Sequence, residues 1–226
     1  PKKKKLMVIF RGINLEYFNK KNVEQIKVDQ LMDQWKINKS DFKILLPGRL
    51  TRWKGQELFI EALSMLVEVH SKNNFHAIIL GSDQGRNVYS KKLLLLVERY
   101  RLAKKITFIE NCKEMPIAYK LSDIVVSSSI EPEAFGRVAV EAQAMEKLII
   151  ASNIGGSKET VLNGKSGLLY NFNDSKDLAK AINKAMEMSK NTLDLMGAEG
   201  RKNVEKKFNV DQMCQTTFTE YMKLLK

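Results

Sequence analysis

Two cations near residue 50 are the first side chains in this sequence that are suited to binding an anion. Arg49 follows an apolar run that ends at Pro47, and Lys54 opens the next helical pattern. An Arg guanidinium binds phosphate through parallel N–H groups, Lys adds a point charge, and a helix start adds free backbone amides. The segment 48–55 therefore predicts a diphosphate site. The alternative is an ordinary basic loop on a basic protein.

Two carboxylates eight residues apart form the second candidate. Glu133 lies just before or at a predicted helix start, and Glu141 lies about two turns into that helix. Gly136 lets a ligand approach the backbone, and a charged carboxylate accepts strong hydrogen bonds from sugar hydroxyls. In the alternative interpretation Glu133 only interacts with the helix dipole and Glu141 lies on the surface. The apolar neighbours of Glu141 argue against a fully solvated position.

A Gly-Gly turn is the third candidate. Gly155 and Gly156 follow an apolar run and precede a short helical pattern. Such a turn suits the close approach of a phosphate or a sugar, but it is equally typical of an ordinary connection between a strand and a helix.

Alternating apolar runs and helical patterns predict the elements that position these residues. Strands are expected at 6–10, 43–47, 75–80, 105–108, 123–127, 148–151 and 167–170. Helices are expected at 22–35, 56–69, 88–101, 115–121, 135–145, 158–162, 175–188 and, with a break near residue 208, 192–226. Continuous apolar strands separated by helices indicate an α/β fold, with a Rossmann-like, doubly wound parallel sheet.

The predicted topology brings the three candidates together. Ligands of doubly wound sheets bind beyond the carboxyl ends of the strands. The segments 48–55, 81–85, 109–111, 127–136 and 152–156 all follow predicted strands, so one site at one edge is expected. No internal linker or repeat interrupts the pattern, and residues 1–226 are predicted to form a single domain, with terminal helices at 192–226.

The net charge of the chain limits the kinds of molecule that it is expected to bind. With 38 Lys and Arg against 26 Asp and Glu, the formal net charge is +12. This excess favours anionic partners, although lysines coating exposed helices explain it as well. Nucleic acid is not expected, because basic clusters interleaved with stacking aromatics are missing. No apolar run approaches the ~20 residues of a membrane span.

The sequence predicts no metal site. His70 and His76 lie six residues apart and cannot share one face of a helix. Cys112 and Cys214 have no metal-ligand spacing and are interpreted as buried thiols in a reducing compartment. We expect no metal and no other cofactor.

Together the motifs resemble the C-terminal domain of the family 4 retaining glycosyltransferases, which is one half of a GT-B fold. The shared pattern is Gly-Arg-x4-Lys-Gly, then Glu-x7-Glu enclosing Phe-Gly, then Gly-Gly and Gly-x-x-Gly-Leu-Leu. The resemblance covers nearly the whole chain from Val8 onward. The sequence departs from the family at Glu146–Leu148, where Gly-x-Pro is common, and at Phe10–Gly12, where Pro-Asn-Gly is common.

The resemblance implies roles for particular residues. Arg49, Lys54 and Glu133 would be the catalytic residues, with the first two holding the donor diphosphate and the third the hydroxyls of the transferred sugar. Glu141 would hold the ribose. The backbone amides of Phe135, Gly136, Arg137 and Val138 would line the sugar and phosphates. The main chain near Ile109 would contact the base, and Gly12 would lie near the interdomain crevice.

The resemblance also implies a reaction and its partners. A hexose would pass from a UDP- or GDP-linked donor to a glycan or glycolipid acceptor with retention. A separate N-terminal domain, absent from this chain, would bind the acceptor, so the chain alone is expected to be an inactive fragment. The basic charge favours a lipid-linked glycan or a lipopolysaccharide core as acceptor. A cytoplasmic location, peripheral at the inner face of the membrane, would follow.

Two other functional classes compete with this interpretation. A non-catalytic basic module for nucleotides or nucleic acid would use the same net charge. A glycosidase would use Glu133 and Glu141 as a carboxylate pair. A glycosidase has no use for a cation pair like Arg49 and Lys54, and its two carboxylates rarely come from one loop and the helix that follows it.

Overall fold

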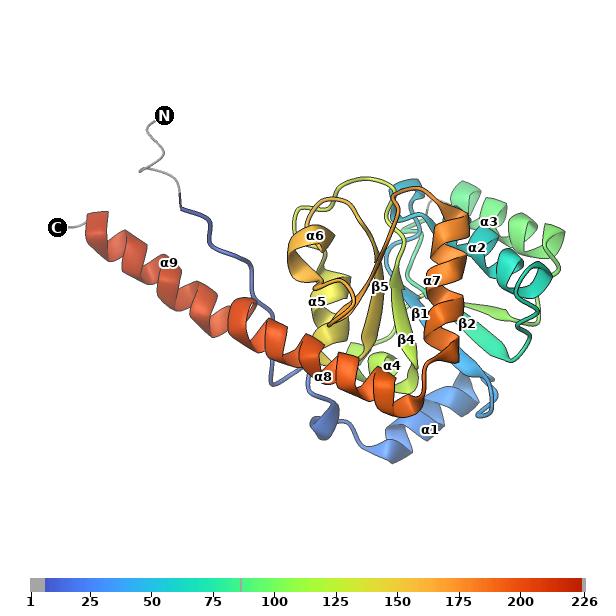
Figure 1. The fold of residues 1–226 in the computed structure, drawn as a ribbon, viewed down its shortest axis with the longest axis horizontal. Helices are drawn as coiled ribbons and strands as arrows, with labels where there is room; N and C mark the ends of the chain where they lie inside the picture. Colours follow the sequence, from blue (N-terminus) through green and yellow to red (C-terminus); the bar gives the residue numbers. More distant parts are fainter. Residues whose placement is uncertain (1–6, 86, 225–226) are drawn as a thin grey trace.

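The computed structural model describes residues 7–85 and 87–224, and its centre is a six-stranded sheet (Figure 1). The strands are β1 (Phe42–Pro47), β2 (Phe75–Leu80), β3 (Ile106–Ile109), β4 (Ile124–Ser127), β5 (Leu148–Ser152) and β6 (Gly167–Tyr170). All neighbours pair in parallel, in the order β3-β2-β1-β4-β5-β6. The order runs outward in both directions from β1 and β4, which confirms the predicted doubly wound, Rossmann-like fold.

Helices cover both faces of this sheet. The long helices are α1 (Gln25–Gln34), α2 (Gln56–Glu68), α3 (Asn87–Arg99), α7 (Ser175–Glu187), α8 (Lys190–Lys207) and α9 (Val210–Leu224). Shorter ones are α4 (Met115–Leu121), α5 (Arg137–Ala144), α6 (Ser157–Thr160) and the 3-10 turns η2 (Lys20–Asn22) and η3 (Arg52–Lys54). In the described part of the chain, no helix combines the length and the apolar character needed to cross a bilayer.

The core consists of two apolar layers, one on each face of the sheet. Successive side chains of a strand point to opposite faces. Ile44 and Leu46 accordingly join the layer that α2, α3 and α7 cover, whereas Leu45 joins the layer beneath α1, α4, α5 and α8. Both kinds of position are buried, which explains why the strand sequences are continuously apolar rather than alternating.

Six of the seven predicted strands are confirmed, and the seventh is wrong. Residues 7–10 form no strand, and Leu6 lies outside the described residues. The segment instead runs beside α9 and has no strand to pair with; Val8 is 77% exposed. A bridge between Ile13 and Asn209 follows the segment three residues later.

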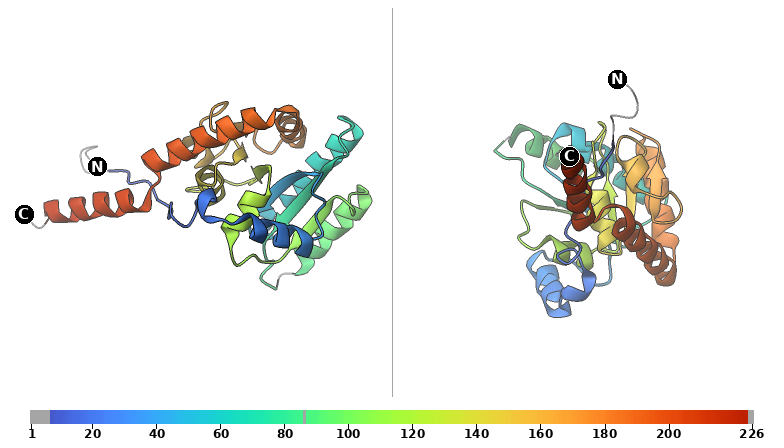
Figure 2. Two further views of the ribbon diagram at one scale, coloured as in Figure 1. Left: turned by 90° about the horizontal axis from the view of Figure 1, so that it is seen from below. Right: turned by 90° about the vertical axis from the view of Figure 1, so that its left-hand side faces the viewer.

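Helix α9 and residues 7–12 extend together away from the sheet (Figure 2). Phe218 and Tyr221 on α9 are 60% and 65% exposed. Cys214 is also exposed on α9 and Cys112 is half-buried, so the expectation that both thiols are buried is wrong. An amphipathic helix that leaves the body of the sheet exposes side chains that the periodic pattern alone marks as core.

Close backbone packing joins α8 to the end of α5. Gly197 lies inside α8, and a Cβ added there would collide with the carbonyl oxygen of Glu146 and lie 2.7 Å from its carbonyl carbon. The loop that contains Glu146 is backbone and cannot move aside as a flexible side chain could. Absence of a side chain at residue 197 therefore allows α8 to approach β5.

We expect Gly197→Ala to destabilise the protein by about 1–3 kcal/mol, because overpacking exceeds the ~1 kcal/mol that Ala gains in helix propensity. The free energy of unfolding in urea measures this change. Leu195→Ala, at a 60% exposed position of the same helix, is the control and should change stability by less than about 0.5 kcal/mol. A stabilised Gly197→Ala variant would contradict the packing argument.

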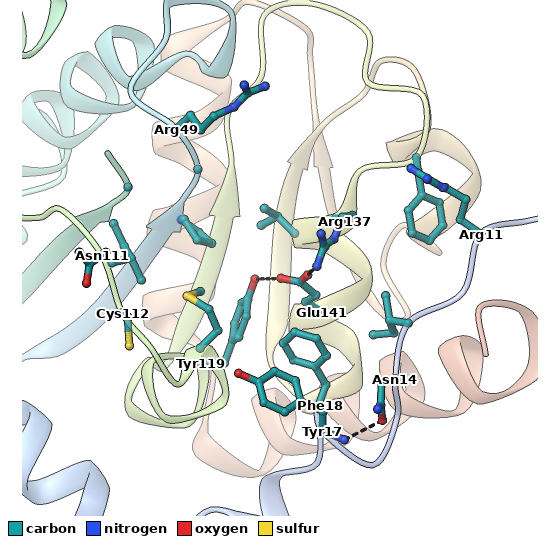
Figure 3. A pocket seen from close by; sticks show the side chains of 18 of the residues that line it. Arg11, Asn14, Tyr17, Phe18, Arg49, Asn111, Cys112, Tyr119, Arg137 and Glu141 are labelled. Carbon is teal, nitrogen blue, oxygen red and sulfur yellow. Dashed lines mark hydrogen bonds and ion pairs between the residues drawn. The ribbon is translucent and has the colours of Figure 1, made fainter. Parts of the chain in front are cut away.

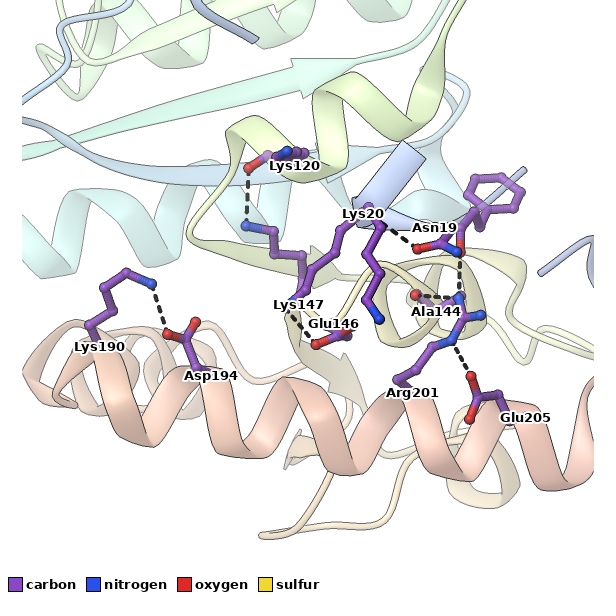
Figure 4. A network of polar contacts seen from close by, with 12 residues as sticks. Asn19, Lys20, Lys120, Ala144, Glu146, Lys147, Lys190, Asp194, Arg201 and Glu205 are labelled. Carbon is purple, nitrogen blue, oxygen red and sulfur yellow. Dashed lines mark hydrogen bonds and ion pairs between the residues drawn. The ribbon is translucent and has the colours of Figure 1, made fainter. Parts of the chain in front are cut away.

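A lysine-rich network lies at the opposite edge of the sheet from the carboxyl ends of the strands (Figure 4). The Lys147 ammonium donates to the carbonyl oxygens of Lys120 at 3.0 Å and Ser122 at 2.6 Å. Lys20 pairs with Glu146 at 2.6 Å on the same surface. Burial, reinforced by the nearby positive charges of Lys190 and Lys20, lowers the pKa of Lys147 to about 8.

The contribution of Lys147 to stability should consequently rise with pH between about 8 and 10.5, the folded and unfolded pKa values of this lysine. In that window the unfolded chain binds the proton and the folded chain does not, so raising the pH favours folding. The gain is at most about 3 kcal/mol. Denaturant unfolding of the wild type and of Lys147→Met isolates the effect, because the variant lacks this titration. A difference between the two proteins that stays constant with pH would contradict the assignment.

Candidate functional site

A cavity of about 920 Å³ opens at the carboxyl ends of the central strands (Figure 3). Gly48 and Arg49 follow β1, and Val138 and Glu141 belong to the helix that follows β4. This is the point at which the strand order reverses, where doubly wound sheets bind their ligands. The segment that follows β1 and the helix α5, which are far apart in the sequence, therefore line different walls of one cavity.

The cavity is basic on the side that follows β1. Arg49 lines it, and its guanidinium carbon lies 5.8 Å from the ring centre of Trp53. Gly55, in the left-handed region at φ 71°, ends the turn η3 and starts α2; a Cβ there would lie 2.9 Å from the carbonyl carbon of Ser128. The turn thus fits against the strand end only with glycine at residue 55. Arg11 adds a second guanidinium from the N-terminal segment.

Lys54 and Glu133 form an ion pair beside this cavity. The Lys54 ammonium lies 2.8 Å from Glu133 Oε1, and the two side chains are 12% and 17% exposed. Ser129 also donates to Glu133 Oε1, and the ammonium lies 4.5 Å from the Trp53 ring centre. A Cβ at Gly48 would lie 3.5 Å from Lys54 Cδ, so the lysine packs against a residue that does line the cavity.

The helix α5 begins two residues later than the sequence predicted, at Arg137 instead of Phe135. Gly136 precedes it in the left-handed conformation (φ 71°, ψ 58°), which a side chain disfavours. The Ala139 amide donates to the Gly136 carbonyl at 3.0 Å, so the amides available to an anion are those that precede it at the helix start. Glu133 therefore lies in the loop before α5 rather than at its first turn.

Glu141 is buried, which excludes the surface alternative. Its Oε2 accepts a 2.8 Å hydrogen bond from the Tyr119 hydroxyl, and its Oε1 accepts bonds of 3.1 and 2.8 Å from Nε and Nη2 of Arg137. Burial and the adjacent Glu141 carboxylate hold the pKa of Tyr119 well above its usual value, so its hydroxyl remains a donor. The carboxylate charge is thus neutralised inside the protein.

The structure brings together most of the predicted site residues. Those that line the cavity are Gly12, Arg49, Phe135, Arg137, Val138 and Glu141. Lys54, Glu133, Gly136 and Ile109 adjoin it without lining it. The Ile109 carbonyl accepts a 2.8 Å hydrogen bond from the Gly81 amide, so it is already used within the sheet edge. The proposed contacts of all ten residues with a ligand stay predictions.

Several cavity residues were given no role of their own from the sequence. Glu110 and Asn111 directly follow β3 and were included only as part of the segment 109–111 expected at the site. Tyr119 was missed, because its partner Glu141 is 22 residues away and α4 looks like an ordinary core helix. Others come from the N-terminal segment and the start of α9: Arg11, Asn14, Tyr17, Phe18 and Met213. No group of three His, Cys, Asp or Glu side chains suited to a metal occurs in residues 7–85 and 87–224.

Tyr119→Phe should destabilise the protein by about 1–3 kcal/mol, because it deletes a buried hydrogen bond to a charged acceptor. Thermal and denaturant unfolding measure the loss. Tyr17→Phe is the matched control, since that ring lines the same cavity but is 46% exposed, and its stability should change by less than about 0.5 kcal/mol. Equal effects of the two substitutions would contradict the role assigned to the Tyr119 hydroxyl.

Known proteins share this arrangement. A family model described as glycosyl transferases group 1 matches residues 27–203. A glycosyltransferase from Rickettsia africae superposes with a TM-score of 0.93 at 32% identity, over 99% of this chain and 58% of that chain. HepE from Anabaena, solved in complex with UDP-glucose, superposes with a TM-score of 0.87 at 26% identity, over 96% of this chain and 57% of that chain.

A curated relative gives the same result at the level of sequence. Spore coat protein SA from Bacillus subtilis is 27% identical over 228 residues, which cover 97% of this chain and 59% of the relative. The chain thus spans about three fifths of the length of these relatives. The match of the family model to most of the chain, together with the shared fold, shows that the chain belongs to the group 1 glycosyltransferases and has the fold of their C-terminal GT-B domain.

Proposed function

We propose that this chain binds a nucleoside diphosphate sugar in the cavity of Figure 3 and supplies the donor half of a retaining hexosyltransferase site. The observation that carries the proposal is the convergence of Arg49, the first turn of α5 and Glu141 on one cavity. A nucleoside diphosphate sugar carries its doubly charged diphosphate between the hydroxyls of the hexose and those of the ribose. Cations and free amides complement the diphosphate, and one carboxylate complements each set of hydroxyls.

Each part of the donor has a group to meet. Arg49 and the amides of Phe135–Val138 bind the diphosphate, joined by Lys54 once its bond to Glu133 is exchanged. Glu133 accepts hydrogen bonds from the hydroxyls of the hexose, and Glu141 from those of the ribose. Gly136 lets the hexose approach the backbone, and the base lies against the main chain that follows Ile109. UDP is the first nucleotide to test, because HepE was solved with UDP-glucose.

This donor-binding domain would contribute to the reaction by electrostatic stabilisation. The bond between the anomeric carbon and the phosphate oxygen breaks, and the acceptor oxygen bonds to the same face of that carbon. Negative charge grows on the departing diphosphate, where fixed cations and helix amides stabilise it. The acceptor hydroxyl transfers its proton to the departing phosphate oxygen, so no side chain of this domain is required as a base.

The acceptor would be bound by a part of the protein outside residues 1–226. Because the chain spans about three fifths of its relatives, we infer that residues 1–226 are one domain and that a further domain binds a glycan or glycolipid. The domain alone binds donor without efficient transfer. The net charge of +12 supports an acceptor on an anionic surface, such as a lipid-linked glycan or lipopolysaccharide core at the cytoplasmic face of a membrane. Gly12 would lie near the crevice between the two domains.

Arg49→Ala should weaken UDP binding by roughly 10- to 100-fold, the range expected for losing a charge-assisted contact. Isothermal titration with UDP, GDP and ADP measures the affinity. Arg52→Ala is the matched control, because this arginine belongs to the same loop but faces a different cavity; its affinity should stay within about twofold of the wild type.

The proposal is wrong if the wild type binds none of these nucleotides, or if both arginine variants lose affinity equally. A steeply salt-dependent affinity for oligonucleotides that UDP and GDP do not displace would support the basic nucleic-acid module instead.

A further inference from the structure

We propose that the Arg137 guanidinium occupies Oε1 of Glu141 in the ligand-free protein. A nucleoside diphosphate breaks this contact by giving both side chains new partners. We call the contact the Arg137 latch. The inference rests on the proposed function, and it assigns a specific role to a side chain for which only a backbone contact was expected. Its consequence is a preference for nucleoside diphosphates over nucleosides.

The two oxygens of Glu141 are held by different kinds of donor. Oε2 accepts from the Tyr119 hydroxyl at 2.8 Å, and Tyr119 is completely buried. Oε1 accepts from two nitrogens of Arg137, whose side chain is 70% exposed. Figure 3 shows the guanidinium projecting over the carboxylate within the cavity. Tyr119 is fixed by its surroundings, whereas Arg137 can move into solvent or toward a ligand.

The latch can exchange its partners but cannot simply open. The Glu141 side chain is 9% exposed, and an unpaired buried charge is strongly disfavoured. Release of Arg137 therefore requires another donor at Oε1. The two hydroxyls of a ribose are such donors, and Oε1 is the oxygen that faces the exposed Arg137 instead of the buried Tyr119.

The released guanidinium is poorly placed without an anion. Arg137 is the first residue of α5, where the positive end of the helix dipole opposes a cation and favours a negative group. Glu141 offsets this repulsion in the ligand-free protein. A diphosphate at the same helix end would take over that task, and a guanidinium binds phosphate through parallel N–H groups. Arg49 and Arg11 line the same cavity and add to the attraction.

A nucleoside and its diphosphate must then respond differently to the loss of Arg137. A nucleoside competes with Arg137 for Glu141 and offers the displaced cation nothing. A nucleoside diphosphate supplies both replacements. Removal of the guanidinium should help the first ligand, because Glu141 is left in need of a donor, and should harm the second, because a phosphate contact is lost.

Chemical-shift titrations with uridine and with UDP test this prediction on the wild type and on Arg137→Ala. We expect uridine to bind about 3- to 10-fold more tightly to the variant and UDP at least about 10-fold more weakly. Lys190→Ala is the matched control. It removes an ion pair with the same i, i+4 spacing and the same 2.8 Å separation, to Asp194, which is more exposed and lies away from the donor cavity, and it should change neither affinity.

Arg137→Lys separates the latch from a loss of folding. It keeps a cation for the phosphate but loses the two-pronged contact with Glu141, so UDP affinity should lie between those of the wild type and Arg137→Ala. Uridine and UDP affinities that move in the same direction in Arg137→Ala would overturn the latch and leave the proposed function intact. A wild type that binds neither UDP nor GDP would overturn both.

Discussion

The pairing of β1 with β4 is the constraint on which the candidate site depends. These strands pair in parallel through Ile44 with Ile124 and Leu45 with Val125, and the chain winds outward from them in opposite directions. The connections that leave the two strands consequently diverge and leave a crevice at their carboxyl ends. Arg49 enters this crevice from β1 and α5 enters it from β4. The meeting of cation, helix end and carboxylate follows from the topology, not from any single motif.

A site that collects opposite charges must also be stable without its ligand. Here two carboxylates are each neutralised by a nearby cation: Lys54 pairs with Glu133 and Arg137 with Glu141. Such pairing avoids an unpaired buried charge, which would destabilise the fold. The cost of desolvating both groups offsets most of their attraction, so the net stabilisation is small. The same four groups are the ones proposed to meet the donor. Ligand-free stability and donor binding therefore use the same side chains in different combinations, and binding becomes an exchange of partners.

Sequence patterns predicted those features that follow from local chemistry and from topology. Runs such as Ile78–Leu80 marked buried parallel strands, and position after a strand located Arg49 and Glu141 at one edge. Contacts between elements left no such mark: the bond from Tyr119 to Glu141 joins two helices that look unrelated in sequence. Residues 7–10 were predicted to form a strand and do not. Their apolar run favours extended backbone, but no neighbouring strand is present among the described residues for it to pair with.

The N-terminal segment is better understood as a wall of the cavity than as part of the sheet. Gly12 was expected near an interdomain crevice because of its family position. A Cβ at this residue would collide with the backbone of Asn209, where α8 gives way to α9. Arg201 further fixes the segment, because its guanidinium donates to the carbonyl of Phe18 at 2.7 Å and to that of Ala144 at 2.9 Å (Figure 4). The wall that carries Arg11 is thus tied both to the start of α9 and to the end of the helix that bears Glu141. The close approach of Gly12 to the backbone of Asn209 gives the small size of this residue a structural reason independent of any ligand.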